Sequence, residues 1–170
     1  MDYKKHVREV PDFPKKGILF YDITTLLMKP DVFNTMINEM AEKAKGMDID
    51  KIAGIESRGF IFGAPLAQKL GKPFILVRKP GKLPYKTVKY EYSLEYGKDT
   101  IEMHADAVEK GDKILLVDDL LATGGTIQAA ANLVKECGGT VAGLLFAIEL
   151  EFLKGRDKLA GLRAESIIKY

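Results

Sequence analysis

Short apolar runs alternate with stretches of helical periodicity along most of this chain. The strand-like runs are residues 51–55, 74–77, 114–117 and 141–148, and the helix-like stretches are residues 31–45, 64–70 and 126–137. Strands separated by helices are typical of βαβ units, so the pattern predicts an α/β fold with a largely parallel central sheet flanked by helices. Pro65 is expected in the first turn of its helix, where a missing N–H is tolerated.

Two segments depart from this pattern. Residues 83–104 carry an alternation of tyrosines, at positions 85, 90, 92 and 96, which predicts either a β-ribbon or a mobile flap. The stretch up to Asp22 precedes the first clear strand and helix pair. With no internal repeat and no linker, residues 1–170 are expected to form a single domain.

The most informative segment is residues 114–126. Its four uncharged apolar residues predict a strand covered on both faces, and Asp118 and Asp119 then follow at the carboxyl end. Ionised carboxylates accept hydrogen bonds, so ribose hydroxyl groups or Mg²⁺ would suit them. Residues 122–126 add two glycines and two hydroxyls before a helix, a pattern that favours phosphate binding by backbone N–H groups. Since the nucleoside triphosphate and dinucleotide fingerprints are absent from the sequence, the segment indicates a sugar phosphate ligand.

Two other polar segments are expected to face the same crevice, because the carboxyl ends of parallel strands meet at one edge of a sheet. In the turn after residues 51–55, Gly59 allows close backbone approach and Arg58 can pair with phosphate oxygens. Residues 78–89 hold five basic side chains and no acidic one. This basic run is either a solvated loop or a carrier for an anion such as pyrophosphate.

Composition narrows the function further. The chain is 46% hydrophobic and 29% charged with a net charge of +2, which suits a soluble globular protein and argues weakly against nucleic-acid binding. The longest apolar run, residues 144–148, is too short to span a bilayer, and the first residues lack the apolar core of a signal peptide. The one cysteine, Cys137, fits a reducing cytosol. We therefore expect a cytoplasmic protein with small-molecule ligands and neither membrane nor nucleic-acid partners.

Residues 115–126 resemble the phosphoribosyl-pyrophosphate motif of the type I phosphoribosyltransferases. Similarity to that family recurs in residues 13–18, 56–60, 78–84, 92–98 and 153–156, so it covers nearly the whole chain. Ala122 and Gly125 are closer to the adenine branch than to the hypoxanthine-guanine branch, which tends to carry Asp at the position of Ala122. The resemblance implies the type I fold, with a small N-terminal hood at about residues 1–30 and a long flexible flap at about residues 78–104.

The activity implied by the resemblance is transfer of a 5-phosphoribosyl group from its 1-diphosphate to N9 of adenine, in purine salvage by a homodimer. It also implies site residues: Asp118 and Asp119 for the ribose; Ala122, Thr123, Gly124, Gly125 and Thr126 for the 5-phosphate; Ser57, Arg58, Gly59, Arg78 and Lys79 for pyrophosphate; Leu19 and Tyr21 for the base; and Glu95 as acid/base. Tyr21 stands where many relatives have Arg, so a side-chain charge is not expected there. Mg²⁺ is expected to be bound through the substrate, with water-mediated contact to Asp118 and Asp119 left open.

Two alternatives remain open at this point. Another purine, such as xanthine, hypoxanthine or guanine, could be the acceptor. A non-catalytic sensor of phosphoribosyl pyrophosphate could use the same fold. Sensors often carry an added DNA-binding domain, for which this chain has no residues left, so the sensor ranks below the enzymes.

Overall fold

The computed structural model describes residues 1–94 and 97–170. The chain divides into two compact units, Met1–Glu39 and Met40–Tyr170. The first unit holds a 3-10 helix (Tyr3–His6), an antiparallel pair of strands, β1 (Arg8–Pro11) and β2 (Leu19–Asp22), and the short helix α1 (Thr24–Leu27). Helix α2 (Pro30–Ala44) begins in the first unit and ends in the second. The single domain with a hood at about residues 1–30 stays a prediction.

A five-stranded parallel sheet organises the second unit. Its strands are β3 (Lys51–Ile55), β4 (Phe74–Val77), β7 (Lys113–Leu121), β8 (Thr140–Glu149) and β9 (Ala164–Lys169), in the spatial order β4-β3-β7-β8-β9. Every neighbouring pair is parallel, so the predicted α/β class is confirmed. Strand β9 was not predicted, because only Ser166 and Ile168 of this edge strand are buried and its other positions break the apolar run.

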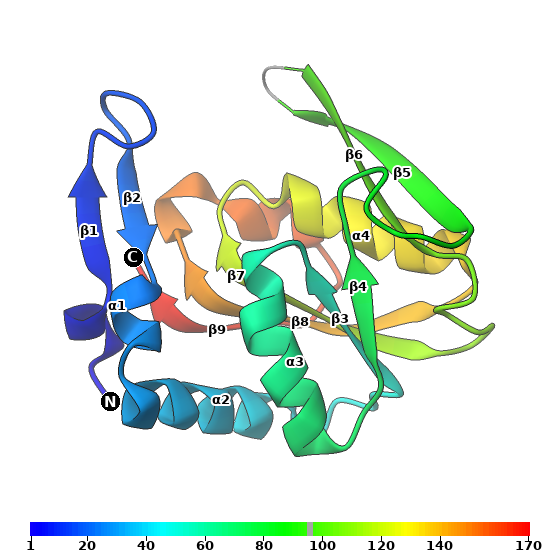
Figure 1. The fold of residues 1–170 in the computed structure, drawn as a ribbon, viewed down its shortest axis with the longest axis horizontal. Coiled ribbons are helices and arrows are strands. Elements are labelled where there is room, and N and C mark those ends of the chain that lie inside the picture. The colour runs from blue at the N-terminus through cyan, green and yellow to red at the C-terminus, as the bar shows by residue number, and fades with distance from the viewer. Residues whose placement is uncertain (95–96) are drawn as a thin grey trace. The chain divides into compact units, whose positions relative to one another are not determined.

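Helices α3 (Arg58–Leu70) and α4 (Gly125–Glu136) pack against the sheet, α3 over β3 and β7, α4 over β7 and β8 (Figure 1). Helix α3 begins at Arg58 rather than at residue 64, so Pro65 lies in its interior and not in its first turn. A proline there removes one helical hydrogen bond. The helix continues because Phe62, Leu66 and Ala67 on one face are buried, and tertiary packing of such a face supplies most helical stability.

Residues 83–104 contain an antiparallel hairpin, which confirms the β-ribbon. Strand β5 (Thr87–Leu94) pairs with β6 (Gly97–His104), and the hairpin lies along α4 (Figure 1). Tyr90 and Tyr92 pack against the main hydrophobic core, and the Asn132 amide donates a hydrogen bond of 3.0 Å to the Tyr90 hydroxyl. Two tyrosines of the alternation are thus half-buried packing residues, whereas Tyr85 is exposed.

In residues 1–94 and 97–170, no helix is long and apolar enough to cross a membrane.

Candidate functional site

Asp118 and Asp119, the acid pair, lie where strand β7 extends beyond the end of its neighbour β3. Strand β7 extends to Leu121, so Asp118 and Asp119 are inside the strand rather than in the turn after it. On one side β3 stops at Ile55, just beyond the Gly54–Val117 pair, while on the other side β8 continues to pair with β7 as far as Glu149. The carboxylates therefore stand at a step in the edge of the sheet, held by β8 alone.

A cleft of about 440 Å³ opens at this step. Three strand ends supply its lining, which consists of Ile55, Glu56, Ser57 and Arg58 after β3, Lys79 after β4, and Asp118, Asp119 and Leu120 in β7, together with Thr126. The expected convergence of the turns that follow Ile55, Val77 and Val117 is confirmed. An acidic pair and two cations thus share one open, polar cavity.

Asp118 and Asp119 have different electrostatic surroundings. Asp119 is buried and forms an ion pair with Arg58, with 2.6 Å between Oδ2 and Nε. Asp118 accepts a hydrogen bond of 2.8 Å from the Asp119 backbone N–H. Burial, together with the neighbouring Asp119 charge, raises the pKa of Asp118 well above its ordinary value. A cation or a pair of hydroxyl donors placed beside Asp118 would stabilise its ionised form and lower its pKa again.

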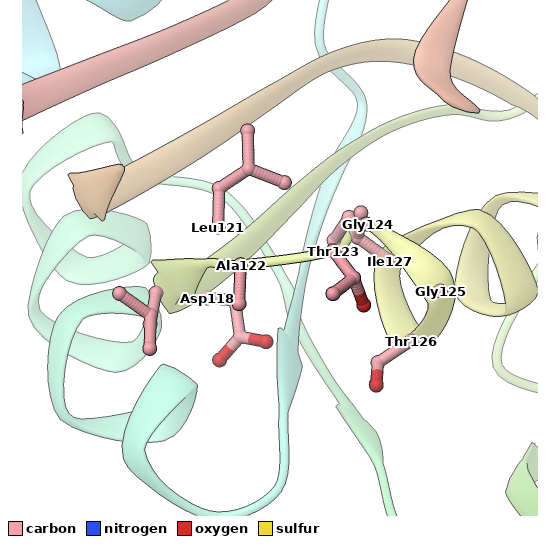
Figure 2. Close-up of a pocket in the computed structure, with 9 residues that line it drawn as sticks. Asp118, Leu121, Ala122, Thr123, Gly124, Gly125, Thr126 and Ile127 are labelled. Carbon is pink, nitrogen blue, oxygen red and sulfur yellow. The ribbon is translucent and has the colours of Figure 1, made fainter. Parts of the chain in front are cut away.

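Residues 122–126 form a tight turn that leads directly into α4. Gly124 has φ +79°, a conformation that favours glycine, and α4 begins at the next residue. A smaller pocket of about 80 Å³ lies in the turn and is lined by Asp118 and residues 120–127. Figure 2 shows the Asp118 carboxylate and the Thr126 hydroxyl on the same side of the strand end. Free N–H groups at the first turn of a helix suit an anion of the size of one phosphate group.

Gly59 serves packing between elements. A Cβ atom at this position would lie 2.8 Å from the Val117 carbonyl oxygen and 3.0 Å from Asp118 Oδ1. Glycine therefore permits the close approach of α3 to β7 here, and the predicted approach of this backbone to a ligand stays a prediction. The Glu56–Ser57 peptide bond just before α3 is cis.

The basic run of residues 78–89 is largely neutralised by buried carboxylates. Glu56, only 10% exposed at its side chain, accepts hydrogen bonds from Arg78 Nε (3.1 Å), Lys82 Nζ (2.8 Å) and the Lys79 backbone N–H (2.9 Å). Glu102 pairs in the same way with Lys89 at 3.4 Å. Of the two residues in this run that were expected at pyrophosphate, Lys79 is among the described residues that line the cleft, whereas Arg78 turns to Glu56.

Sequence reasoning assigned no role to Glu56. The signal was present, since this carboxylate directly follows a buried strand and opens the segment 56–60 that carries part of the family resemblance. What the sequence could not give is its partners, because Arg78 and Lys82 lie more than twenty residues further along the chain.

The hairpin is tied to both sides of the cleft. The Tyr92 hydroxyl is 3.0 Å from Asp99 Oδ2 and 3.3 Å from Thr126 Oγ1, and Asp99 also forms an ion pair with Lys79. Burial raises the pKa of Tyr92. Asp99 and Tyr92 were not singled out as site residues, although Tyr92 belonged to the tyrosine alternation. Two groups proposed to contact anions, Lys79 Nζ and Thr126 Oγ1, are thus shared with the hairpin.

Three expected site residues are not among the described residues that line the cleft. Glu95, the expected acid/base residue, lies outside the described residues. Leu19 and Tyr21, expected at the base, are on β2 of the first unit, where Leu19 is exposed and burial raises the pKa of Tyr21. In the described part of the chain, no group of three or more His, Cys, Asp or Glu side chains is arranged to hold a metal ion.

Comparison with known proteins gives consistent matches over the full chain. Residues 30–162 match the family model for the phosphoribosyl transferase domain. The adenine phosphoribosyltransferase of Acetivibrio thermocellus is 54% identical over 171 residues, which cover 100% of both chains. The crystal structure of the Thermoanaerobacter pseudethanolicus adenine phosphoribosyltransferase is similar with a TM-score of 0.97 at 54% identity, covering 99% of this chain and 98% of that one. The Saccharomyces cerevisiae enzyme, solved with adenine and an imino-altritol bisphosphate, has a TM-score of 0.90 at 38% identity and coverages of 97% and 96%.

Proposed function

This chain belongs to the adenine phosphoribosyltransferase family, and we propose that it transfers the 5-phosphoribosyl group of 5-phospho-α-D-ribose 1-diphosphate to N9 of adenine, giving AMP and pyrophosphate. The observation that carries the proposal is the meeting of the phosphate-sized turn, the acid pair and two cations around one cleft. Asp118, Leu120 and Thr126 line both cavities, which supports one ligand with a phosphate at one end, hydroxyls in the middle and a diphosphate at the other.

In this assignment the turn at residues 122–126 binds the 5-phosphate through backbone N–H groups and Thr126 Oγ1. Asp118 and Asp119 accept hydrogen bonds from the ribose hydroxyls. Arg58, Lys79 and the backbone of residues 57–59 hold the leaving pyrophosphate. Anchoring the remote phosphate supports catalysis because binding energy spent there positions the reacting carbon.

The chemistry to be supported is a build-up of positive charge on the ribose ring as pyrophosphate leaves. Carboxylates beside the ribose stabilise that charge, and fixed cations stabilise the departing anion. The oxygen-rich acid pair fits Mg²⁺ that arrives with the diphosphate, and Asp118 and Asp119 would hold it through water. When bound, Mg²⁺ supplies charge neutralisation of the leaving group.

Adenine recognition and proton transfer are assigned by family resemblance. We propose that Leu19 and Tyr21 border the base and that Glu95 hydrogen-bonds or protonates the purine edge. The yeast relative was solved with adenine, which supports a purine as the acceptor. Base choice is the part of the proposal that most needs a direct assay.

The test is AMP formation from adenine, 5-phosphoribosyl 1-diphosphate and Mg²⁺, with hypoxanthine, guanine and xanthine in parallel reactions. We expect turnover with adenine alone. Turnover with another base instead would contradict the adenine assignment but leave the sugar phosphate site standing. Tight binding of the sugar diphosphate without any turnover would favour a sensor.

We further propose a homodimer in the cytoplasm. The half-buried Cys137 thiol and the modest net charge of +2 are compatible with that compartment, and the exposed Leu76 on the sheet-edge strand β4 offers apolar surface for a second copy. Sedimentation velocity of the purified chain distinguishes a dimer from a monomer.

A further inference from the structure

Residues 150–156 lie against the turn of residues 122–126, the phosphate turn. No role has been assigned to them so far. The Leu150 backbone N–H donates a hydrogen bond of 2.9 Å to the Leu121 carbonyl, just before the turn. Gly155 is buried, and a Cβ atom there would overlap the Ala122 carbonyl oxygen. In the other direction, a Cβ atom on Gly124 would lie 2.5 Å from the Gly155 carbonyl oxygen. The two backbones therefore fit together only because both residues are glycines.

Arg156, the next residue, is held firmly by the sheet. Its guanidinium forms a bidentate pair with Glu149, at 2.5 Å from Nε to Oε1 and 2.7 Å from Nη2 to Oε2. Nη1 donates to the Ala164 carbonyl at 2.8 Å, and the Ser166 hydroxyl donates to Glu149 Oε2 at 2.5 Å. Glu149 is 3% exposed, and the Arg156 hydrogen bonds hold its pKa below the ordinary value. A bidentate pair fixes the orientation of the guanidinium as well as its distance from the carboxylate.

The backbone just before Gly155 is also constrained. Lys154 has φ +52°, a left-handed conformation that is uncommon for a residue with a side chain. Such conformations persist where the surrounding structure determines them, and they cluster at functional sites. Lys154 is followed directly by Gly155, which contacts the phosphate turn, and by Arg156, which pairs with Glu149.

We propose that Gly155 and Arg156 are positioning residues for the phosphate turn. The Arg156–Glu149 pair anchors Gly155, and Gly155 supports the backbone of Ala122 and Gly124 from behind, so that the N–H groups of the turn stay directed at one phosphate. Neither residue touches the substrate in this assignment. The inference rests on the proposed function, because it concerns affinity for the 5-phosphate end of that substrate.

The two ends of the substrate provide a specific test, since the support lies behind the 5-phosphate and not behind the pyrophosphate groups. Calorimetry measures binding of ribose 5-phosphate and, separately, of inorganic pyrophosphate with Mg²⁺, to the wild-type chain and to Gly155→Ala and Arg156→Lys. Gly155 has no left-handed φ, so the first change adds the overlap with the Ala122 backbone and a close contact of 3.0 Å with Leu121 Cδ1. Lysine keeps the positive charge of Arg156 but cannot form the two parallel hydrogen bonds to Glu149. The control is Arg163→Lys, a half-exposed arginine seven positions on whose partners are Glu165 and the Lys43 carbonyl.

Both variants are expected to weaken ribose 5-phosphate binding about tenfold or more, the cost of misaligning one charge-assisted hydrogen bond, with pyrophosphate binding nearly unchanged. The control should leave both affinities unchanged. Unchanged ribose 5-phosphate binding in a folded variant overturns the inference, as does an equal loss for both ligands. If Gly155→Ala fails to fold, Arg156→Lys decides.

The wild-type measurement separates this inference from the proposed function. A wild-type chain that binds ribose 5-phosphate but forms no AMP contradicts the proposed reaction and leaves the positioning role to be read from the variants. A wild-type chain that does not bind ribose 5-phosphate overturns both the phosphate assignment and the positioning role.

Discussion

Glu56 should make a measurable, pH-dependent contribution to stability. Burial by itself would raise the pKa of this carboxyl, but hydrogen bonds from Lys82, Arg78 and the Lys79 backbone outweigh burial and lower the pKa from 4.5 to about 2. The unfolded chain therefore takes up this proton at a higher pH than the folded chain. The stabilisation is complete above pH 4.5 and is lost as the pH falls towards 2.

The size of the effect follows from linkage. A pKa difference of this size corresponds to about 3 kcal/mol of unfolding free energy in full, of which about 1 kcal/mol is lost by pH 4 and about 2 kcal/mol by pH 3. The perturbation is Glu56→Gln, which keeps the shape and an acceptor for the Lys79 N–H but cannot titrate. The variant should be less stable than wild type at neutral pH because Arg78 and Lys82 lose their common counter-charge.

The assay is urea unfolding of both proteins at several pH values from 7 to 3, followed by circular dichroism. The stability difference between wild type and Glu56→Gln should shrink steadily as the pH falls. Other paired carboxylates titrate in both proteins, so they cancel in the difference. Glu42→Gln, at an exposed site on α2 where the carboxylate pairs with Lys45, serves as the control and should give a difference that is small at every pH. Parallel loss of stability in wild type and Glu56→Gln over the whole range would refute the reasoning.

The remaining predictions concern the cleft and the hairpin. The double change Asp118→Asn with Asp119→Asn should lower kcat/KM for AMP formation about 100-fold or more while circular dichroism stays native, since two charge-assisted hydrogen bonds to the ribose are lost; near-normal turnover would contradict the ribose assignment. Glu95→Gln should lower kcat more than affinity for the sugar diphosphate, and a loss of affinity alone would make Glu95 a residue that positions the base. Asp99→Asn, which removes the ion-pair partner of Lys79 and a hydrogen-bond partner of Tyr92, should speed amide hydrogen exchange in β5 and β6 about fivefold. Glu91→Gln on the same hairpin, which breaks an exposed pair with Lys98, should not change the exchange rate. Equal effects would show that the contacts between the hairpin and the cleft add no stability.

The sequence alone determined the fold class, because uncharged runs such as residues 51–55 and 74–77 have the length of buried strands and are separated by helical periods. It also predicted where a phosphate would bind, since a strand, two carboxylates and a glycine-rich turn before a helix are local features. The convergence of three turns at one edge then followed from parallel topology. The start of α3 was not predicted, because the local pattern placed Pro65 in the first turn of the helix. The helix begins earlier, at Arg58, because the face that holds Phe62, Leu66 and Ala67 is buried.

Only the tertiary structure decided which charges meet. The basic run of residues 78–89 indicated either a solvated loop or an anion carrier, and in the structure Glu56 and Glu102 pair with three of its five cations. Gly59 was predicted to allow backbone approach to a ligand, and Gly155 only belonged to a segment that resembles the family. The structure shows that a backbone from elsewhere in the chain lies against each of them. Local patterns predict most strands and helices because the periodicity of apolar residues is visible along the chain. Ion pairs and close backbone contacts depend on residues far apart in sequence, so they exist only once the chain has folded.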